Sequence, residues 1–261
     1  MPFSERSVAG ETRTIGRATP RFDPLPATRF GLISLASDAV ASDEIRAILA
    51  GDGRAIHETR IENSDRIDRE TLAAMEPRLT GAAGLLPMPE AYDSVGYLCT
   101  SAATEIGSER VAALINAAVP GAEITDPMRA AVAACEHLSA RRIGLVTPYV
   151  DAVTERIAAR IEAAGIVVAR ASSFDVDQDS RVALIDAGAI GEAVATVAES
   201  ADTVFVSCTA LRTVKYIAGW EAICGLPVIS SNQAVAWHML RTGRLAPAPG
   251  QWGRLFGAVS R

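Results

Sequence analysis

Two of the four cysteines stand where a thiol could do chemistry. Cys99 and Cys208 each end an apolar run, and each is followed by a threonine and a helix-like segment. In parallel α/β proteins, ligands bind where a strand leads into a helix, and the backbone N–H groups there favour anions. A helix N-terminus also lowers the pKa of a thiol, as a nucleophile or a base requires. One such thiol in each half of the chain predicts a symmetric site, with one sulfur on each side of a substrate.

The other two cysteines, Cys135 and Cys224, fall in helical patterns, and we interpret them as structural. A small buried hydrophobic side chain is also the alternative for Cys99 or Cys208 taken singly, but their matched settings favour chemistry. The chain is rich in core residues, has no Cys-x-x-Cys pair and lacks a secretory signal peptide. We therefore expect reduced thiols in the cytoplasm.

The sequence predicts no metal and disfavours one common cofactor. Cys135 and His137 lie two positions apart in a helical pattern, so they point to different faces of the helix. His57 and His238 have no neighbours of ligand type. Lys215 is the only lysine and lies in an expected helix, which disfavours a pyridoxal-phosphate enzyme because that cofactor needs a Schiff-base lysine.

Length and composition limit the fold and the partners. The chain has 261 residues, of which 49% are hydrophobic, and its formal net charge is −6. This length suits one large α/β domain or two domains of ordinary size. No apolar run is long enough to predict a membrane span. Because the sequence shows neither a basic stripe nor an aromatic platform, we expect no nucleic-acid partner and no membrane partner.

Apolar runs and helical patterns alternate after residues 1–28, which we expect to be a flexible N-terminal arm. Pro77 should divide the second helix, Asp126-Pro127 should begin the fourth, and Pro148-Tyr149-Val150 should form the loop that leaves the fifth strand. We expect strands at 29–36, 54–61, 94–99, 123–125, 142–147, 166–172, 203–208 and 227–230. We expect helices at about 42–50, 68–83, 104–118, 127–138, 151–164, 185–199, 213–224 and 232–241, followed by an irregular tail.

The order of these elements repeats. The interval from Gly31 to Cys99 is close to that from Gly144 to Cys208, and the two halves share one order of strands and helices. Right-handed crossovers then predict an α/β fold of two similar doubly wound parallel-sheet lobes, related by a pseudo-twofold, with the active site in the cleft between them. We place the first lobe at 29–126 and the second at 127–230, with 231–261 returning to pack on the first.

Several motifs between residue 29 and about residue 245 carry a family resemblance. They are Gly31-Leu32-Ile33, Cys99-Thr100-Ser101, Ile143-Gly144-Leu145-Val146-Thr147-Pro148-Tyr149, Ser207-Cys208-Thr209-Ala210-Leu211-Arg212, and Ser230-Ser231-Asn232-Gln233 followed by Trp237-His238. The Ser-Cys-Thr-x-Leu-Arg and Thr-Pro-Tyr pieces are more specific than a lone Cys-Thr. On these motifs the sequence resembles the aspartate/glutamate racemase superfamily, and within it the maleate cis-trans isomerases and the ectoine-utilisation (EutA-like) proteins.

The resemblance implies chemistry without a cofactor at a carbon next to a carboxylate. In the racemases one thiolate removes the α-proton and the opposite thiol returns a proton to the other face. In the maleate isomerases the first cysteine adds to the double bond, the adduct rotates, and elimination gives the trans product. Arylmalonate decarboxylases of the same superfamily keep one such cysteine, so the pair Cys99 and Cys208 argues against decarboxylation.

The resemblance also implies residues that bind the substrate. The Tyr149 hydroxyl would reach the substrate, with a plain loop aromatic as the alternative. Asn232 would bind the substrate or only cap the last helix. Four residues that follow the cysteines would present backbone N–H groups to a carboxylate, with helix capping as the alternative: Thr100, Ser101, Thr209 and Ala210.

Asp38 departs from the isomerase pattern, which has a substrate-binding asparagine after the first strand. A carboxylate there would repel a dianion such as maleate and would suit a substrate with an ammonium or amide N–H. Capping of the first helix is the alternative role. A second isomerase asparagine would fall near residues 175–179, where most polar side chains are acids. An amino-acid derivative is therefore expected ahead of maleate itself.

Together these features predict a cytoplasmic, cofactor-independent isomerase or racemase of a small carboxylate. It would use Cys99 and Cys208 and would assemble as a homo-oligomer, either a dimer or a tetramer. Maleate cis-trans isomerisation proper is the alternative reaction. A protein that only binds or senses a small molecule in the two-lobed cleft is the alternative of another class, and it predicts unreactive thiols.

Overall fold

The computed structural model describes residues 18–88 and 92–257. Residues 18–27 are exposed and have no regular structure, and the strand β1 begins at Thr28. The rest of the predicted arm, residues 1–17, lies outside the described residues.

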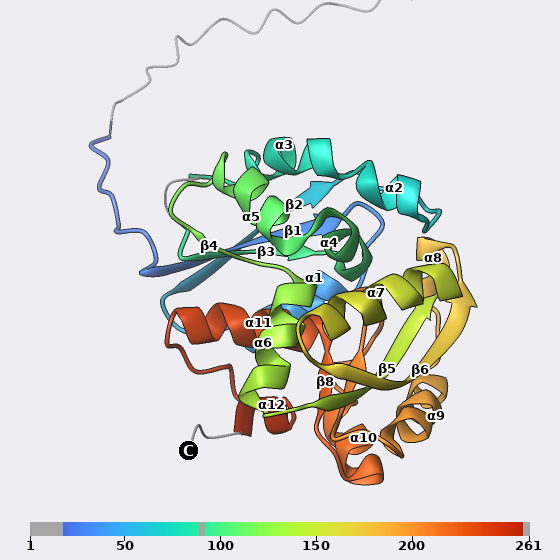
Figure 1. The fold of residues 1–261 in the computed structure, drawn as a ribbon. Coiled ribbons are helices and arrows are strands. Elements are labelled where there is room, and N and C mark those ends of the chain that lie inside the picture. Colours follow the sequence, from blue (N-terminus) through green and yellow to red (C-terminus); the bar gives the residue numbers. More distant parts are fainter. Residues whose placement is uncertain (1–17, 89–91, 258–261) are drawn as a thin grey trace, which may run out of the picture.

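Two parallel sheets of four strands form the core of the fold (Figure 1). The order is β2-β1-β3-β4 in the first sheet and β6-β5-β7-β8 in the second, so the two sheets repeat one topology. This confirms the predicted α/β class with two parallel-sheet lobes. The strands are β1 (Thr28–Leu35), β2 (Arg54–Ile61), β3 (Ser94–Leu98), β4 (Glu123–Thr125), β5 (Arg142–Tyr149), β6 (Val167–Val176), β7 (Thr203–Val206) and β8 (Val228–Ser230).

Apolar runs form the inner strands because both faces of a parallel sheet are covered by helices. β3 and β7, which lead to the two cysteines, are buried along their whole length. The helices are α1 (Ala41–Leu49), α2 (Arg69–Ala73), η1 (Glu76–Arg78), α3 (Leu79–Ala83), α4 (Thr100–Ile106), α5 (Ser108–Asn116), α6 (Pro127–His137), α7 (Asp151–Ala163), α8 (Asp179–Val182), α9 (Ala187–Ala198), α10 (Ile217–Cys224), α11 (Ser231–Thr242) and α12 (Arg254–Gly257).

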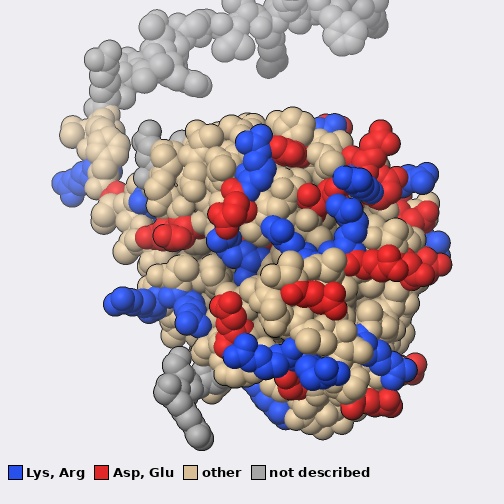
Figure 2. All heavy atoms as spheres, viewed as in Figure 1, with Lys and Arg blue, Asp and Glu red and all other residues tan. Residues whose placement is uncertain are grey.

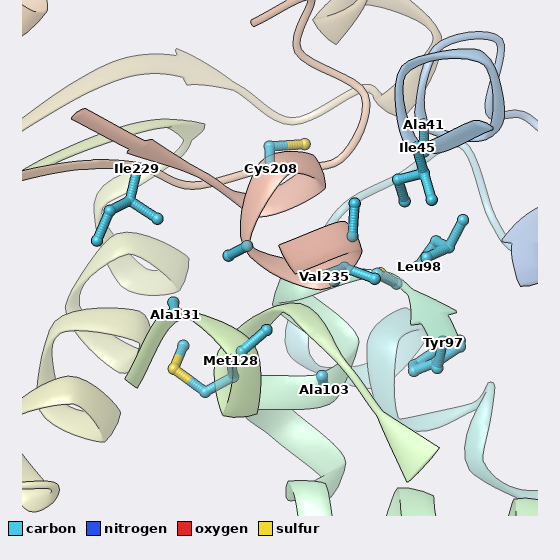
Figure 3. Close-up of a cluster of buried hydrophobic side chains, with 14 of the residues drawn as sticks. Ala41, Ile45, Tyr97, Leu98, Ala103, Met128, Ala131, Cys208, Ile229 and Val235 are labelled. Atoms are coloured by element: carbon cyan, nitrogen blue, oxygen red, sulfur yellow. The ribbon is translucent and has the colours of Figure 1, made fainter. Parts of the chain in front are cut away.

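The last long helix, α11, lies between the sheets (Figure 1). It packs on α1 and α6, on β3 and β4 of the first sheet, and on β8 of the second. Figure 3 shows the resulting apolar cluster, in which Val235 of α11 is drawn with Leu98 from the first sheet and Ile229 from the second. α11 therefore contacts both sheets. The predicted division of the chain into two lobes, at residues 126 and 230, stays a prediction.

Glycine breaks the helix that was expected over 104–118. Gly107 has φ 90°, a left-handed conformation that ends α4 and separates it from α5. A second glycine is required by packing, because a Cβ at Gly144 would lie 2.5 Å from the carbonyl oxygen of Val197. Gly144 thus allows α9 to pack closely on β5.

Three other expectations for local structure are wrong. Pro148 and Tyr149 belong to β5 rather than to a loop, with a shift in register against β6 where the proline has no N–H to give. The helix expected from residue 213 begins only at Ile217, after a segment of turns. The tail contains one short helix, α12, whereas it was expected to be irregular.

None of the helices in the described ranges has both the length and the apolar character needed to cross a bilayer. On the face drawn in Figure 2, acidic and basic side chains are interspersed, and neither sign gathers into one large area.

Candidate active site

The two thiols occupy equivalent ends of the two sheets. Cys99 directly follows β3 and is the N-cap residue of α4, and Cys208 lies just beyond the end of β7. Both side chains are buried and both cysteines are free. The Thr209 hydroxyl, directly after Cys208, donates to the carbonyl of Leu98, directly before Cys99, at 3.0 Å. The structure therefore brings the two predicted catalytic side chains into one region.

Burial controls the ionisation of both thiols. It raises the pKa of Cys99 to about 11, against smaller lowering effects from the Ala102 N–H and the Ser101 hydroxyl, whose Oγ lies 3.6 Å from the sulfur. Burial also raises the pKa of Cys208, and the Ala210 N–H, 3.4 Å from that sulfur, opposes it. The expectation that a helix N-terminus gives a lowered thiol pKa is wrong, because loss of water on burial raises the pKa of both thiols more than the N–H groups lower it.

Tyr149 lies with the thiols rather than in a loop. Its side chain is buried at the end of β5, and burial raises its pKa well above the ordinary value. The charges of both thiolates raise this pKa further, and the hydroxyl interacts by hydrogen bonding with Cys208 and Ser101. Tyr149 is thus placed to contact anything held between the sulfurs.

The start of α11 connects the two cysteine loops. Ser231 Oγ lies 2.8 Å from Thr100 Oγ1 and accepts a hydrogen bond from the Cys208 N–H at 3.1 Å. Thr209 Oγ1 donates to the Leu98 carbonyl at 3.0 Å. The residues after each cysteine are therefore bonded to the opposite loop or to α11, which fixes the relative position of the two loops.

Asn232 has a structural role in the ligand-free protein. Its Nδ2 donates to the Thr209 carbonyl at 2.9 Å and to Glu44 Oε2 at 2.8 Å. The Oδ1 atom is buried and has no hydrogen-bond partner. Ser230, not Asn232, caps α11, through a capping box with Gln233. Of the Asn232 side chain, only Oδ1 is left for a substrate.

Asp38 has one oxygen engaged and one unpaired. Oδ1 accepts from the Val40 and Ala41 N–H groups at 2.6 and 2.8 Å, which supports the start of α1. Oδ2 is buried without a partner. Burial raises the pKa of Asp38, and the charge of Asp179 raises it further. The capping role and a ligand-binding role are therefore compatible, because they use different oxygens.

Asp179 brings a second carboxylate to the site. It lines a small cavity together with Cys99 and Ser101, and its charge raises the pKa of both thiols. Burial raises the pKa of Asp179 itself, although its Oδ2 accepts from Ser37 Oγ. Sequence reasoning noted acids near 175–179 but did not assign this residue.

Two segments from opposite lobes meet over this cavity. Arg66 and Gln178 form an antiparallel bridge, and the Ile67 N–H donates to the Asp177 carbonyl at 2.8 Å. The Asp179 N–H donates to the Asp65 carbonyl at 2.7 Å. Backbone pairing between the loops that follow β2 and β6 therefore forms part of the wall of this cavity.

Two further residues of the site were missed. Tyr97 is fully buried, and its hydroxyl interacts with the Cys99 sulfur and donates to Met75 Sδ at 3.7 Å. It stands two positions before Cys99 on β3, so the alternation of a strand points it to the same face. Glu44 on α1 contacts the segment after Cys208, and nothing in its sequence setting indicates this. Within residues 18–88 and 92–257, no three His, Cys, Asp or Glu side chains gather as a metal site.

Comparison with known proteins finds one matching family model and several similar enzymes. The family model for arylmalonate decarboxylase matches residues 94–256. The maleate isomerase of Nocardia farcinica (strain IFM 10152) is 27% identical over 244 residues, which cover 87% of this chain and 94% of that protein. The arylmalonate decarboxylase of Bordetella bronchiseptica is 32% identical over 123 residues, 46% of this chain and 51% of that protein.

Solved structures agree with the fold. The maleate isomerase Iso from Pseudomonas putida S16 superposes with a TM-score of 0.80 at 25% identity, covering 89% of this chain and 99% of that one. A double mutant of arylmalonate decarboxylase in the liganded form gives a TM-score of 0.76 at 25% identity, covering 88% and 99%.

Proposed function

The chain belongs to the arylmalonate decarboxylase family, and from this premise we propose that it is a cofactor-independent isomerase or racemase of a small carboxylate. Membership of the aspartate/glutamate racemase-like superfamily, with maleate isomerases as relatives, is confirmed. The likeness to EutA-like proteins stays a prediction.

One observation carries the proposal: two buried thiols follow equivalent strands of the two sheets, and the Thr209 hydroxyl after Cys208 bonds to the Leu98 carbonyl before Cys99. A pair of acid/base groups on opposite sides of one carbon suits proton transfer. The Cys99 thiolate takes a proton from the carbon next to the carboxylate, the electron pair passes into the carboxylate, and the Cys208 thiol gives its proton to the other face. The reverse direction exchanges the two roles. Each positioned acid or base contributes on the order of 10²–10⁴-fold to the rate.

We assign the substrate carboxylate to the turn after each thiol. The backbone N–H groups of Thr100, Ser101, Thr209 and Ala210 lie there, and such groups bind anions. Negative charge that develops on the carboxylate during proton removal is stabilised by the same groups. The Tyr149 hydroxyl adds a donor on the side of Cys208 and Ser101.

The substrate class follows from the acids beside the thiols. The unpaired Oδ2 of Asp38 needs a donor, and Asp179 adds a second buried carboxylate. A substrate that carries an ammonium or amide N–H supplies such a donor, whereas a dianion adds repulsion. We therefore propose an amino-acid derivative as the substrate.

Maleate cis-trans isomerisation is the second candidate. It is favoured by the maleate isomerase of Nocardia farcinica, which aligns with 87% of this chain. In that reaction one cysteine adds to the double bond and later leaves, so a mass adduct on Cys99 would distinguish it from proton exchange.

Assembly as a homo-oligomer and location in the cytoplasm both stay predictions.

The test uses thiol variants and a panel of small amino acids, their N-acyl derivatives and maleate. Proton NMR in D₂O follows exchange at the α-carbon and cis-trans conversion. We expect turnover of one panel member by the wild type and by Cys224→Ser, and a loss of at least about 10²-fold in Cys99→Ser and in Cys208→Ser. Near-native turnover in both of these last variants would refute the proposal. Turnover of no compound, together with thiols that stay unreactive even at high pH, supports the binding or sensor alternative.

A further inference from the structure

Glu44 is a half-buried residue of α1, and the groups bonded to its carboxylate all lie after Cys208 in the sequence. Its Oε1 accepts from the backbone N–H groups of Thr213 at 2.7 Å and Val214 at 3.0 Å. Its Oε2 accepts from Thr213 Oγ1 at 3.1 Å and from Asn232 Nδ2 at 2.8 Å. One carboxylate from the first half of the chain thus receives four donors from the second half.

The segment that Glu44 holds leads directly away from the second thiol. Residues 209–216 connect Cys208 to α10 through turns only, without a strand ladder or a helix. Thr213 and Val214 are nevertheless buried. Buried backbone N–H groups need acceptors, and here the Glu44 carboxylate supplies them. The position of this segment therefore depends on a side chain outside it.

A short chain of hydrogen bonds also joins Glu44 to the residue before Cys99. Asn232 Nδ2, which donates to Glu44, also donates to the Thr209 carbonyl at 2.9 Å. Thr209 Oγ1 in turn donates to the carbonyl of Leu98 at 3.0 Å. Leu98 is the residue before Cys99. The contacts of Glu44 therefore reach the backbone on both sides of the thiol pair.

Glu44 itself is not placed to do chemistry. It does not line the cavity that contains Cys99, Ser101 and Asp179. Burial is the main cause of the raised pKa of Cys99, and the charges that add to it are those of Asp179 and Asp38. All four groups bonded to the Glu44 carboxyl are donors, so it acts as an acceptor.

We propose that Glu44 is a positioning residue that holds the Cys208 sulfur opposite Cys99 by fixing the segment that follows Cys208. The consequence for catalysis rests on the proposed function, but the consequence for the thiols does not. Without this carboxylate, the segment at 209–216 loses its acceptors and opens locally, so Cys208 becomes accessible while Cys99 keeps its place at the end of β3. In a reaction that needs both sulfurs, displacement of one by about 1 Å costs on the order of 10²-fold in rate.

The experiment compares the two thiols within one protein. Full-length Glu44→Ala and Glu44→Gln are treated with iodoacetamide at pH 9, and alkylation of Cys99 and Cys208 is followed separately by peptide mass spectrometry. Two controls lie on the same helix. Asp43→Ala removes an exposed acid, and Ile48→Ala removes a buried apolar side chain one turn further along α1 without removing an acceptor of the Thr213 and Val214 N–H groups.

In Glu44→Ala we expect the ratio of the Cys208 rate to the Cys99 rate to rise at least about tenfold, as the loss of one hydrogen bond to a charged group gives in a local opening. Glu44→Gln keeps one carbonyl oxygen for the N–H groups but presents an amide NH₂ to Asn232. Its ratio of the Cys208 rate to the Cys99 rate should therefore lie between those of the wild type and Glu44→Ala. Both controls should keep the wild-type ratio, although Ile48→Ala lowers the melting temperature. If Glu44→Ala does not fold, Glu44→Gln carries the test.

An unchanged ratio in the Glu44 variants overturns the proposal, and so does an equal rise for both thiols, which general loosening would give. Once a substrate is known, kcat should fall in Glu44→Ala with little change in KM. A shifted ratio in a protein whose turnover does not need the thiols would overturn the proposed function and leave the positioning role intact.

Discussion

The ionisation of Cys99 gives the most quantitative prediction. In the ligand-free protein burial raises its pKa from 9.0 to about 11. At pH 7 only about one Cys99 side chain in 10⁴ is then a thiolate, roughly a hundredfold fewer than for an ordinary cysteine, and the difference corresponds to about 2.7 kcal/mol. Alkylation by iodoacetamide needs the thiolate, so its rate at Cys99 should climb about tenfold per pH unit from pH 7 and level off only near pH 11.

Asp179→Asn tests the cause of this shift. Burial is the largest cause and the charge of Asp179 a smaller one, so the variant should move the midpoint of the Cys99 curve downward but leave it above the midpoint of the unfolded protein. The assay is peptide-resolved alkylation over a pH series, with circular dichroism at each pH to show that the fold persists. A curve that levels off below pH 9 in the folded, ligand-free wild type would refute the reasoning.

Three other predictions follow from the acids and from one glycine. By calorimetry, wild type should bind aspartate at least about tenfold more tightly than succinate, which has the same skeleton without the amino group. The double variant Asp38→Asn/Asp179→Asn should reduce this ratio of affinities, whereas the exposed control Asp175→Asn should keep it. Equal affinities in the wild type would contradict the assigned substrate class. Burial raises the pKa of Asp179, so its contribution to stability is full below its ordinary value of 3.8 and is lost as the pH rises through the raised pKa. Asp179→Asn should therefore melt at a higher temperature than wild type at pH 7, with the gap closing toward pH 4. A gap that stays constant with pH would count against this. A Cβ at residue 144 would lie 2.5 Å from the Val197 oxygen, so Gly144→Ala should lower the free energy of unfolding in urea by about 1–3 kcal/mol. Gly81→Ala, which has open space around the new Cβ, is the control. Equal changes in the two variants would show that the protein relieves the close contact at residue 144.

Local signals in the sequence were sufficient for most of the fold. The strands predicted at Arg54–Ile61 and Glu123–Thr125 match β2 and β4 to the residue. Asp126 caps α6, with its side chain accepting from Met128 and Arg129, and Pro127 is the first residue of the helix. In each case one strong, local rule of backbone chemistry acts alone, and the prediction succeeds.

Errors arose where two rules compete. A proline usually ends a strand, but the pairing of β5 with β6 accommodates Pro148 through a shift in register. The strand β5 therefore continues to Tyr149. The helix expected from residue 213 begins only at Ile217, and long-range bonds from the N–H groups of Thr213 and Val214 to Glu44 hold the segment before it. Contacts between residues far apart in the sequence decided both outcomes, and periodicity does not report such contacts.

The candidate site was predictable in its reactive groups and not in their support. Matched strand ends led to the prediction that Cys99 and Cys208 act as a pair, and the structure places both at equivalent strand ends. The raised pKa of these thiols was not predictable, because it depends on how completely the closed site excludes water. Glu44 and Asp179 reach the site through folding of the whole chain, and their neighbours in the sequence carry no sign of it.

The central claim is that both sulfurs act on one small carboxylate held between them. A crystal structure of the Cys99→Ser protein soaked with the panel compound that the wild type turns over tests it most directly. The account predicts the carboxylate-bearing carbon between the hydroxyl introduced at position 99 and the Cys208 sulfur, with the carboxylate on the turns that follow these two positions. A ligand bound elsewhere, such as in the hollow lined by His137, Trp237 and Arg241, with nothing between residues 99 and 208, would contradict it.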